Sequence, residues 1–321
     1  MKLLLTGCAG YVGSMVAHEL LAQGHSVRGY DNLMYGGEPM LGFWANPNFD
    51  FVKGDVRDPL AVRAAVEGCD GIVHLAAIVG DPACKREPEL ARSTNLDGSI
   101  NLIEEAKRAG LKRFVFASTC SNYGKMTDPD KLVDESSELS PVSLYAETKV
   151  AVENIVMDAA KMGPVSGTSL RFSTVYGVSP RMRYDLTVNQ FAREAWKDRK
   201  LMVFGEQFWR PYIHVRDMAR GVAVACMAPE ELVSGEVFNV GSTAENYTKK
   251  MIVELLQGMI PDLEVEYVSQ NDDPRDYRVS FAKIETRLGF GISRTVPQGL
   301  KEILSLVSQE ILSEAGRKFG N

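Results

Sequence analysis

The sequence predicts an α/β fold, a doubly wound parallel sheet with helices on both faces, joined to a smaller C-terminal lobe. In the first half, short apolar segments alternate with amphipathic segments of helical length. This alternation is typical of a parallel sheet with right-handed crossover connections. After about Val175 the loops become longer and more polar, and helices alternate with short strands. At 321 residues the chain is long enough for one large domain or two unequal ones.

The expected elements follow one another in regular order. The expected strands are Lys2–Leu5, Ser26–Tyr30, Asp50–Lys53, Gly71–Leu75, Arg113–Ala117 and Thr168–Phe172. The expected helices are Val12–Ala22, Pro59–Val66, Glu89–Ala109, Ala146–Lys161 and, near the end, about Val296 to Leu312. We therefore expect a first domain over residues 1–175, to which segments near 211–240 return. Residues 176–321 mainly form the second lobe, interwoven with the first domain.

Composition narrows the classes of function. The net charge is −6 and the pI is near 5.4, which argues against a nucleic-acid or anionic-membrane partner. The five cysteines show no CxxC pair, and their odd number suits reduced thiols in a cytoplasm. Met1–Leu5 is too short for a secretory signal, and no apolar stretch approaches membrane-spanning length. The histidines form no metal-ligand pattern, so no metal is expected.

A glycine-rich turn follows the first expected strand directly. In Thr6-Gly-Cys-Ala-Gly-Tyr-Val-Gly13, Gly7 permits a tight turn, Gly10 allows a close approach to a pyrophosphate, and Gly13 allows close helix–strand packing. The helix that starts here presents free N–H groups and the positive end of its dipole to phosphates. This strand–turn–helix context predicts a dinucleotide site of the Rossmann type.

The ends of the next strands add to that site. Asp31 would accept hydrogen bonds from the adenosine ribose hydroxyls and repel a 2′-phosphate, which favours NAD over NADP. Asp55 is placed to meet the adenine edge, although it also suits a simple strand-end turn. Leu75, Ala76 and Ala77 are small enough to leave room for the middle of the cofactor, whereas His74 is expected to be a packed strand residue.

Tyr145 and Lys149 form a candidate proton-transfer pair. Residues four apart on a helix lie on the same face. A free tyrosine has a pKa near ~10, and a nearby lysine cation favours the phenolate. We therefore expect Lys149 to lower the pKa of Tyr145, so that the phenol can take a proton from an alcohol or a sugar hydroxyl.

Together these segments resemble the extended short-chain dehydrogenase/reductase family, specifically the NAD-dependent nucleotide-sugar epimerases and dehydratases. The resemblance covers nearly the whole chain. Its segments are Thr6–Gly13, Asp31-Asn32-Leu33, Gly54-Asp55, His74–Ala77, Asn95, Thr119, Tyr145 with Lys149, Arg171–Gly177, Arg210–Asp217, Phe238–Gly241 and Arg275-Asp276. It implies a Rossmann domain with a substrate lobe. It also implies a homodimer in which helices Glu89–Ala109 and Ala146–Lys161 form a four-helix bundle.

The resemblance also implies the roles of individual residues at the cofactor end. Thr119, four residues before the Tyr123-Gly124 pair, would be catalytic with Tyr145 and Lys149. Its hydroxyl would bridge the substrate oxygen and the Tyr145 phenol, while Asn95 would brace the preceding helix. The implied cofactor-binding residues are Gly7, Gly10, Tyr11, Val12, Asp31, Asn32, Asp55, Val56, Leu75, Ala76, Ala77, Asn95, Tyr145 and Lys149.

At the substrate end, Arg210 and Arg275 match the family's arginines for the sugar-nucleotide diphosphate, since guanidiniums grip phosphate oxygens in bidentate fashion. Arg181 is a candidate for a phosphate or sugar contact. The implied substrate-binding residues are Asp81, Ser121, Thr174, Arg181, Asn189, Arg210 and Arg275. Thr174 stands where relatives often carry Asn. Cys84 lies on a loop that the family points at the sugar, and a role in specificity and a plain surface thiol both remain open.

The residues after Thr119 bear on the reaction. The 4,6-dehydratases of this family place Asp-Glu there, and UDP-glucuronate decarboxylases place Glu at the second position. This chain has Cys120 and Ser121, which disfavours both reactions. The sequence therefore favours an NAD-dependent epimerase that acts on a nucleotide-activated sugar through a transient 4-keto intermediate. The alternatives are an oxidoreductase giving net C4 oxidation or reduction, and a non-catalytic NAD-binding sensor.

Overall fold

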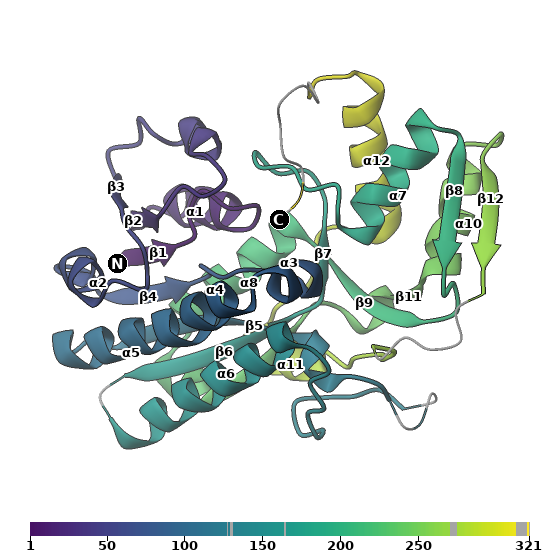
Figure 1. Ribbon diagram of the computed structural model, residues 1–321. Coiled ribbons are helices and arrows are strands. Elements are labelled where there is room, and N and C mark those ends of the chain that lie inside the picture. The colour runs from purple at the N-terminus through teal and green to yellow at the C-terminus, as the bar shows by residue number, and fades with distance from the viewer. Residues whose placement is uncertain (127, 129–130, 164, 270–274, 313–319, 321) are drawn as a thin grey trace.

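The computed structural model describes residues 1–126, 128, 131–163, 165–269, 275–312 and 320. Its centre is a sheet of parallel strands in the order β10-β6-β5-β4-β1-β2-β3 (Figure 1). The strands are β1 (Lys2–Thr6), β2 (Ser26–Asp31), β3 (Phe49–Lys53), β4 (Gly71–His74), β5 (Arg113–Thr119), β6 (Ser166–Phe172) and β10 (Glu236–Val240). The doubly wound parallel sheet is confirmed, and the expected strands are present to within two residues at each end.

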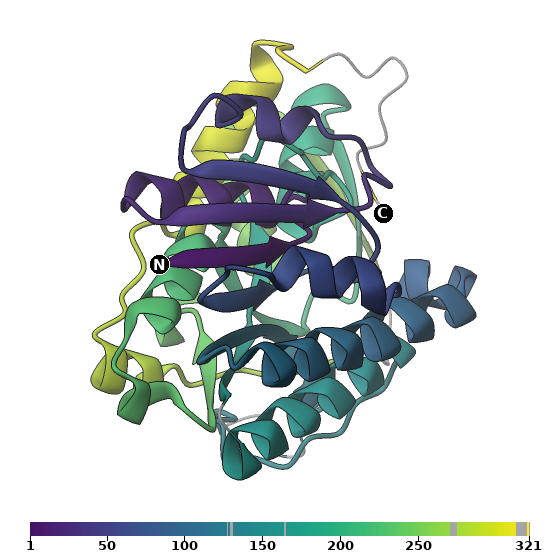
Figure 2. The same cartoon turned by 90° about the vertical axis from the view of Figure 1, so that its left-hand side faces the viewer.

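Helices cover both faces of this sheet (Figure 2). One face packs against α1 (Gly13–Ala22) and α8 (Val215–Met227). The other packs against α2 (Pro59–Val66), α5 (Gly98–Ala109) and α6 (Leu144–Met162). Strand β1 shows why both faces are apolar: Leu3 and Leu5 lie in one core, and Leu4 lies in the other. Successive strand residues point to opposite faces, so a strand covered on both sides must be apolar throughout.

The expected helix Glu89–Ala109 is present, and it runs through a π-helical turn. The structure has α3 (Asp81–Arg86), α4 (Pro88–Arg92), a π-helical turn over Ser93–Asp97, and then α5. In that turn the Asn95 side chain accepts a hydrogen bond from the Ile78 N–H at 2.7 Å and donates to the Ile78 carbonyl at 3.0 Å. The turn therefore directs Asn95 onto the segment that leaves β4, and such turns are frequent at functional sites.

A second lobe is built around its own hydrophobic core. It contains a three-stranded sheet in the order β11-β9-β7 and a two-stranded sheet of β12 and β8. Its elements are β7 (Thr174–Tyr176), α7 (Thr187–Lys197), β8 (Lys200–Phe204), β9 (Trp209–His214), β11 (Asn246–Thr248), α10 (Lys249–Met259), β12 (Glu264–Val268) and α12 (Val296–Ser308). Between and beside these, α8 and β10 return to the first domain, which makes the two parts interwoven. Helix α12 ends four residues before the expected Leu312.

The remaining short elements lie in connections. They are η1 (Glu38–Gly42), η3 (Cys120–Tyr123), α9 (Glu230–Val233), η4 (Thr243–Glu245) and α11 (Ala282–Leu288). Among the described helices, none combines the length and apolar character needed to cross a membrane.

Candidate active site

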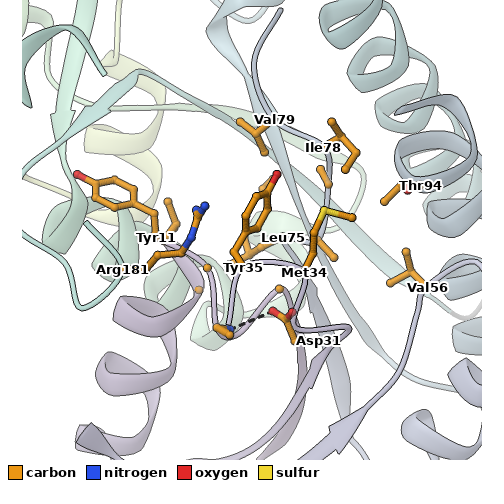
Figure 3. Close-up of a pocket in the computed structure, with 18 of the residues that line it drawn as sticks. Tyr11, Asp31, Met34, Tyr35, Val56, Leu75, Ile78, Val79, Thr94 and Arg181 are labelled. Carbon is orange, nitrogen blue, oxygen red and sulfur yellow. Dashed lines mark hydrogen bonds between the residues drawn. The ribbon is translucent and has the colours of Figure 1, made fainter. Parts of the chain in front are cut away.

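A deep pocket lies at the carboxyl ends of the central strands, where the strand order reverses between β1 and β4 (Figure 3). This is where parallel α/β sheets bind their ligands. Residues of both the first domain and the second lobe line it. Its lining contains every residue expected to bind the cofactor except Asn95, and also Thr119. Residues far apart in the sequence, from Gly7 to Lys149, therefore meet in one cavity.

The glycine-rich turn fits a dinucleotide diphosphate. Gly7 has a φ of +73°, and its N–H donates to the Tyr30 carbonyl at 2.9 Å, which fixes the turn against β2. A Cβ at Gly13 would lie 1.9 Å from the Gly7 carbonyl oxygen, so any larger residue would push the turn away from α1. The turn and the first residue of α1 both line the pocket, so the N-terminal end of this helix borders the space where a phosphate would bind.

Asp31 and Asp55 line the pocket beyond this turn. The Asp31 carboxylate accepts hydrogen bonds from the N–H groups of Ala9 (3.1 Å) and Leu33 (2.8 Å), and burial raises its pKa. Leu33 has a φ of 61°, a conformation that this hydrogen bond helps to hold. Asp55 accepts from Arg57 at 2.8 Å and from the Asn32 amide at 3.2 Å, and its pairing with Arg57 lowers its pKa to about 2.

His74 is a structural residue, as expected. It is fully buried at the end of β4, and burial lowers its pKa to about 3. The Ser99 hydroxyl donates to the Asn95 carbonyl, so it accepts from His74 Nε2 (2.8 Å). Nδ1 must then accept from the Thr6 hydroxyl at 2.8 Å, whose oxygen in turn accepts from the Leu75 and Ala76 N–H groups. This chain of hydrogen bonds shapes the floor of the pocket.

Thr119, Tyr145 and Lys149 all line the same pocket from β5 and α6. Thr119 ends β5, and its hydroxyl oxygen accepts from the Ser121 N–H at 3.1 Å. Tyr145 lies in the first turn of α6, which is capped by Ser143. One turn later, Lys149 Nζ donates to the Ala117 carbonyl at 2.7 Å and lies 5.9 Å from the centre of the Tyr145 ring.

The pKa of Tyr145 differs from our expectation. Burial raises it above its usual value, whereas the spacing alone suggested that Lys149 would lower it. Burial also lowers the pKa of Lys149 to about 7, so at neutral pH this lysine carries only part of its charge. The cation that offsets part of the increase at Tyr145 is Arg183, from the second lobe.

Two cysteines near the site are packed inside the protein. Cys84 is a buried residue of α3, and its thiol donates to the Ile78 carbonyl at 3.3 Å, so it is not the surface thiol considered above. The Cys120 thiol donates to the Arg171 carbonyl at 3.2 Å, and burial raises its pKa strongly. Both thiols are therefore poor nucleophiles.

The residues expected to bind substrate are more dispersed. Of these, Arg181 lines the pocket, and it does so beside Asp31 and Tyr35. Asn189 is buried and joins parts of the second lobe, since its amide accepts from the Gly177 N–H (2.9 Å) and donates to the Arg183 carbonyl (2.8 Å). Thr174 lies on β7.

The other four substrate candidates lie where the two parts of the molecule meet. Ser121 accepts a hydrogen bond from the Tyr277 hydroxyl at 3.4 Å. Arg210 lies with its guanidinium 5.3 Å from the centre of the Tyr277 ring. Arg275 pairs with Asp81 at 3.0 Å.

Several lining residues have no recognisable signal in the sequence. Met34 and Tyr35 come from the connection after β2, and Met218 comes from α8, which only the packing brings here. Arg183 also lines the pocket, and its electrostatic effect on Tyr145 depends on how the second lobe folds back.

The chain matches the family model described as "NAD dependent epimerase/dehydratase family" over residues 3–241. It is 28% identical to a UDP-glucuronate 4-epimerase of Thermodesulfobacterium geofontis, over 96% of each chain. It is also 28% identical to UDP-glucuronic acid decarboxylase 2 of Arabidopsis thaliana, over 98% of this chain and 70% of the relative. Among solved structures it is similar to a UDP-glucose 4-epimerase of Thermotoga maritima with UDP-glucose. The TM-score is 0.86 at 26% identity, over 97% of this chain and 100% of the other.

Proposed function

This chain belongs to the NAD-dependent epimerase/dehydratase family, and we propose that it is an NAD-dependent epimerase of a nucleotide-activated sugar that works through a transient 4-keto sugar. This proposal rests on one observation. Thr119, Tyr145 and Lys149 line the same pocket as the glycine-rich turn and Asp31. Relatives named as UDP-glucuronate and UDP-glucose 4-epimerases support the substrate class.

The residues of the pocket have separate roles in the proposed epimerisation. NAD, held by the glycine-rich turn and Asp31, would supply the hydride acceptor and donor that the reaction needs. Tyr145, as phenolate, accepts the proton of the sugar hydroxyl and gives it back in the second half of the reaction. Thr119 holds the same oxygen through its hydroxyl. Lys149, whose Nζ donates to the Ala117 carbonyl, stabilises the Tyr145 phenolate while the lysine is in its charged form.

The acidic groups of the pocket favour epimerisation over dehydration or decarboxylation. Among the described lining residues the carboxylates are Asp31 and Asp55, and both lie at the end of the pocket expected to hold adenosine. Cys120 and Ser121, which stand where related dehydratases carry acids, supply no carboxyl group. Asp81, whose charge influences Tyr145, is paired with Arg275 and lies outside the described lining of this pocket.

The test is the Tyr145→Phe variant. Because it removes the only atom that transfers the proton, turnover of nucleotide sugars should fall by about 10²- to 10⁴-fold or more, while NAD stays bound. UDP-, GDP-, dTDP- and CDP-sugars should be screened by mass spectrometry and NMR. The matched control is Tyr267→Phe, an exposed tyrosine on β12 that should leave turnover unchanged. Undiminished turnover in Tyr145→Phe would refute the catalytic role.

The same assays separate the alternatives. An epimerase changes the sugar's stereochemistry without net NADH, whereas a C4 dehydrogenase or ketoreductase produces or consumes NADH in step with the sugar, which absorbance measures. A non-catalytic sensor would bind NAD and turn over no sugar in the screen.

We further propose a cytoplasmic homodimer. Helices α5 and α6 lie side by side on the outside of the first domain (Figures 1 and 2). Ile100 on α5 is an exposed apolar side chain. An interface formed by this face of two copies of the chain would bury it. A monomeric mass in light scattering would contradict the dimer. The cytoplasmic location rests on the five buried cysteine thiols.

A further inference from the structure

A loop of the second lobe, Gly177–Arg183, is hydrogen-bonded to the glycine-rich turn of the first domain. The Tyr11 hydroxyl donates to the Gly177 carbonyl at 2.6 Å, and the Ser179 hydroxyl donates back to the Tyr11 carbonyl at 2.6 Å. The Ser179 hydroxyl also lies 3.4 Å from that of Ser14, in the first turn of α1. The loop is thus fixed relative to the turn that is shaped for phosphates.

Arg181 extends from this loop into the pocket. It is 9% exposed, and its guanidinium lies 4.1 Å from the centre of the Tyr35 ring, a contact that crosses from one lobe to the other. Figure 3 shows its side chain between Tyr11 and Tyr35, on the same side of the pocket as the glycine-rich turn. Its Nη2 donates to the Gly320 carbonyl at 3.2 Å.

The charges around Arg181 suit an anionic ligand at this point. Burial lowers the pKa of Arg181 and raises that of Asp31, and the charge of Arg181 offsets part of the increase at Asp31. Asp31 has its oxygens directed at the Ala9 and Leu33 N–H groups and faces the ribose end of the site. A planar guanidinium beside a glycine-rich turn and a helix N-terminus is the arrangement that binds a diphosphate in bidentate fashion.

We propose that Arg181, supported by the Tyr35 ring, binds the diphosphate of NAD and so closes the second lobe over the cofactor. The inference rests on the proposed function, because it takes NAD as the resident dinucleotide. It moves Arg181 from the substrate-binding set, where the sequence placed it, to the cofactor-binding set. Its consequence is slow release of NAD between turnovers, which suits an enzyme that returns the hydride to the same sugar.

The experiment measures ligand binding to protein freed of nucleotide, by calorimetry, without any sugar present. Arg181→Gln should weaken binding of NAD and of ADP by about 10- to 100-fold, the effect of losing hydrogen bonds to a charged group. Binding of adenosine, which has no phosphate, should change little. Tyr35→Leu should weaken the binding of NAD by roughly two- to fivefold, because it removes only the aromatic ring that supports the Arg181 guanidinium.

Arg193→Gln is the matched control. Arg193 lies 5.3 Å from the centre of the Tyr184 ring, also in the second lobe, and does not line the pocket. It should leave NAD affinity unchanged. Thermal unfolding of each variant shows that the fold persists. Should Arg181→Gln prove unfolded, Arg181→Lys keeps the charge but loses the bidentate geometry, and a weakened affinity for NAD is again expected.

Two outcomes would overturn the inference. One is unchanged affinity for NAD and ADP in Arg181→Gln; weaker binding of a nucleoside diphosphate sugar in the same variant would then return Arg181 to the substrate-binding set. The other is an equal loss for adenosine and ADP, which would mean a general change of the pocket. Neither depends on turnover, so a protein that epimerises no sugar could still satisfy the inference, and an active epimerase could still fail it.

Discussion

Lys149 is a buried amine whose charge state changes near neutral pH. Its Nζ is held by the Ala117 carbonyl and lies 4.7 Å from the centre of the Phe116 ring, so little solvent stabilises the ammonium form. Burial lowers its pKa from 10.5 to about 7. The unfolded chain therefore keeps the lysine proton over a range in which the folded protein has lost it. Over that range, linkage makes the folded state more stable as the pH rises.

Lys149→Met should reveal this effect in the free energy of unfolding. The difference between variant and wild type, measured with urea, should be most favourable to the variant below pH 7 and should fall steadily from about 7 toward 10.5. The control is Lys161→Met at the exposed end of the same helix, measured over the same pH range. A difference for Lys149→Met that does not vary with pH would mean that the lysine is charged in the folded protein throughout.

Helix α6 carries more than the catalytic pair. Glu153 lies one further turn along the face of Tyr145 and Lys149, and it is buried against Arg171 of β6 at 2.5 Å. Another nitrogen of this guanidinium donates to the Tyr123 hydroxyl at 2.9 Å, and Tyr123 closes the short helix that follows Thr119. One arginine thus fixes the helix of Tyr145 relative to the segment of Thr119.

Glu153→Gln should lower the free energy of unfolding by roughly 3–5 kcal/mol, because it leaves the Arg171 charge buried without its carboxylate. The double variant Glu153→Leu/Arg171→Met should lose less than Glu153→Gln, since no charge then remains buried. Glu147→Gln, on the exposed face of α6, should stay within about 0.5 kcal/mol of wild type. Urea unfolding measures all four proteins, and an equal loss in Glu147→Gln would contradict the explanation.

Elements that depend on local pattern could be predicted from the sequence. The glycine-rich turn, Asp31 and the spacing of Tyr145 and Lys149 are local features, and helix α2 has the bounds expected of it. The π-helical turn at Ser93–Asp97 could not be predicted, because it accompanies the contact of Asn95 with the Ile78 backbone, a partner 17 positions away. Amphipathic spacing continues through this segment and indicates the helix but not the π turn within it.

At the scale of the whole molecule, the contacts between the first domain and the second lobe could not be predicted from the sequence. Asp276 accepts from the Trp209 N–H of β9 at 2.8 Å, and its carbonyl accepts from the Met126 N–H of the first domain at 2.8 Å. Beside it, Arg275 pairs with Asp81, which also accepts from the Ser143 hydroxyl at the start of α6. Motif matching assigned Arg275 and Asp81 separately to substrate and did not show that they contact each other.

This contact has a consequence for nucleotide binding. If Arg275 grips the diphosphate of the sugar nucleotide, Asp81 competes with that ligand for the same guanidinium. Asp81→Asn should then tighten binding of a free nucleoside diphosphate by roughly two- to fivefold, the scale of a partly exposed ion pair. Arg275→Gln should weaken it, and adding Asp81→Asn to Arg275→Gln should change nothing further. Calorimetry with UDP, GDP, dTDP and CDP completes this double-mutant cycle. If Asp81→Asn instead weakens binding in both backgrounds, Asp81 contacts the ligand itself and the competition does not occur.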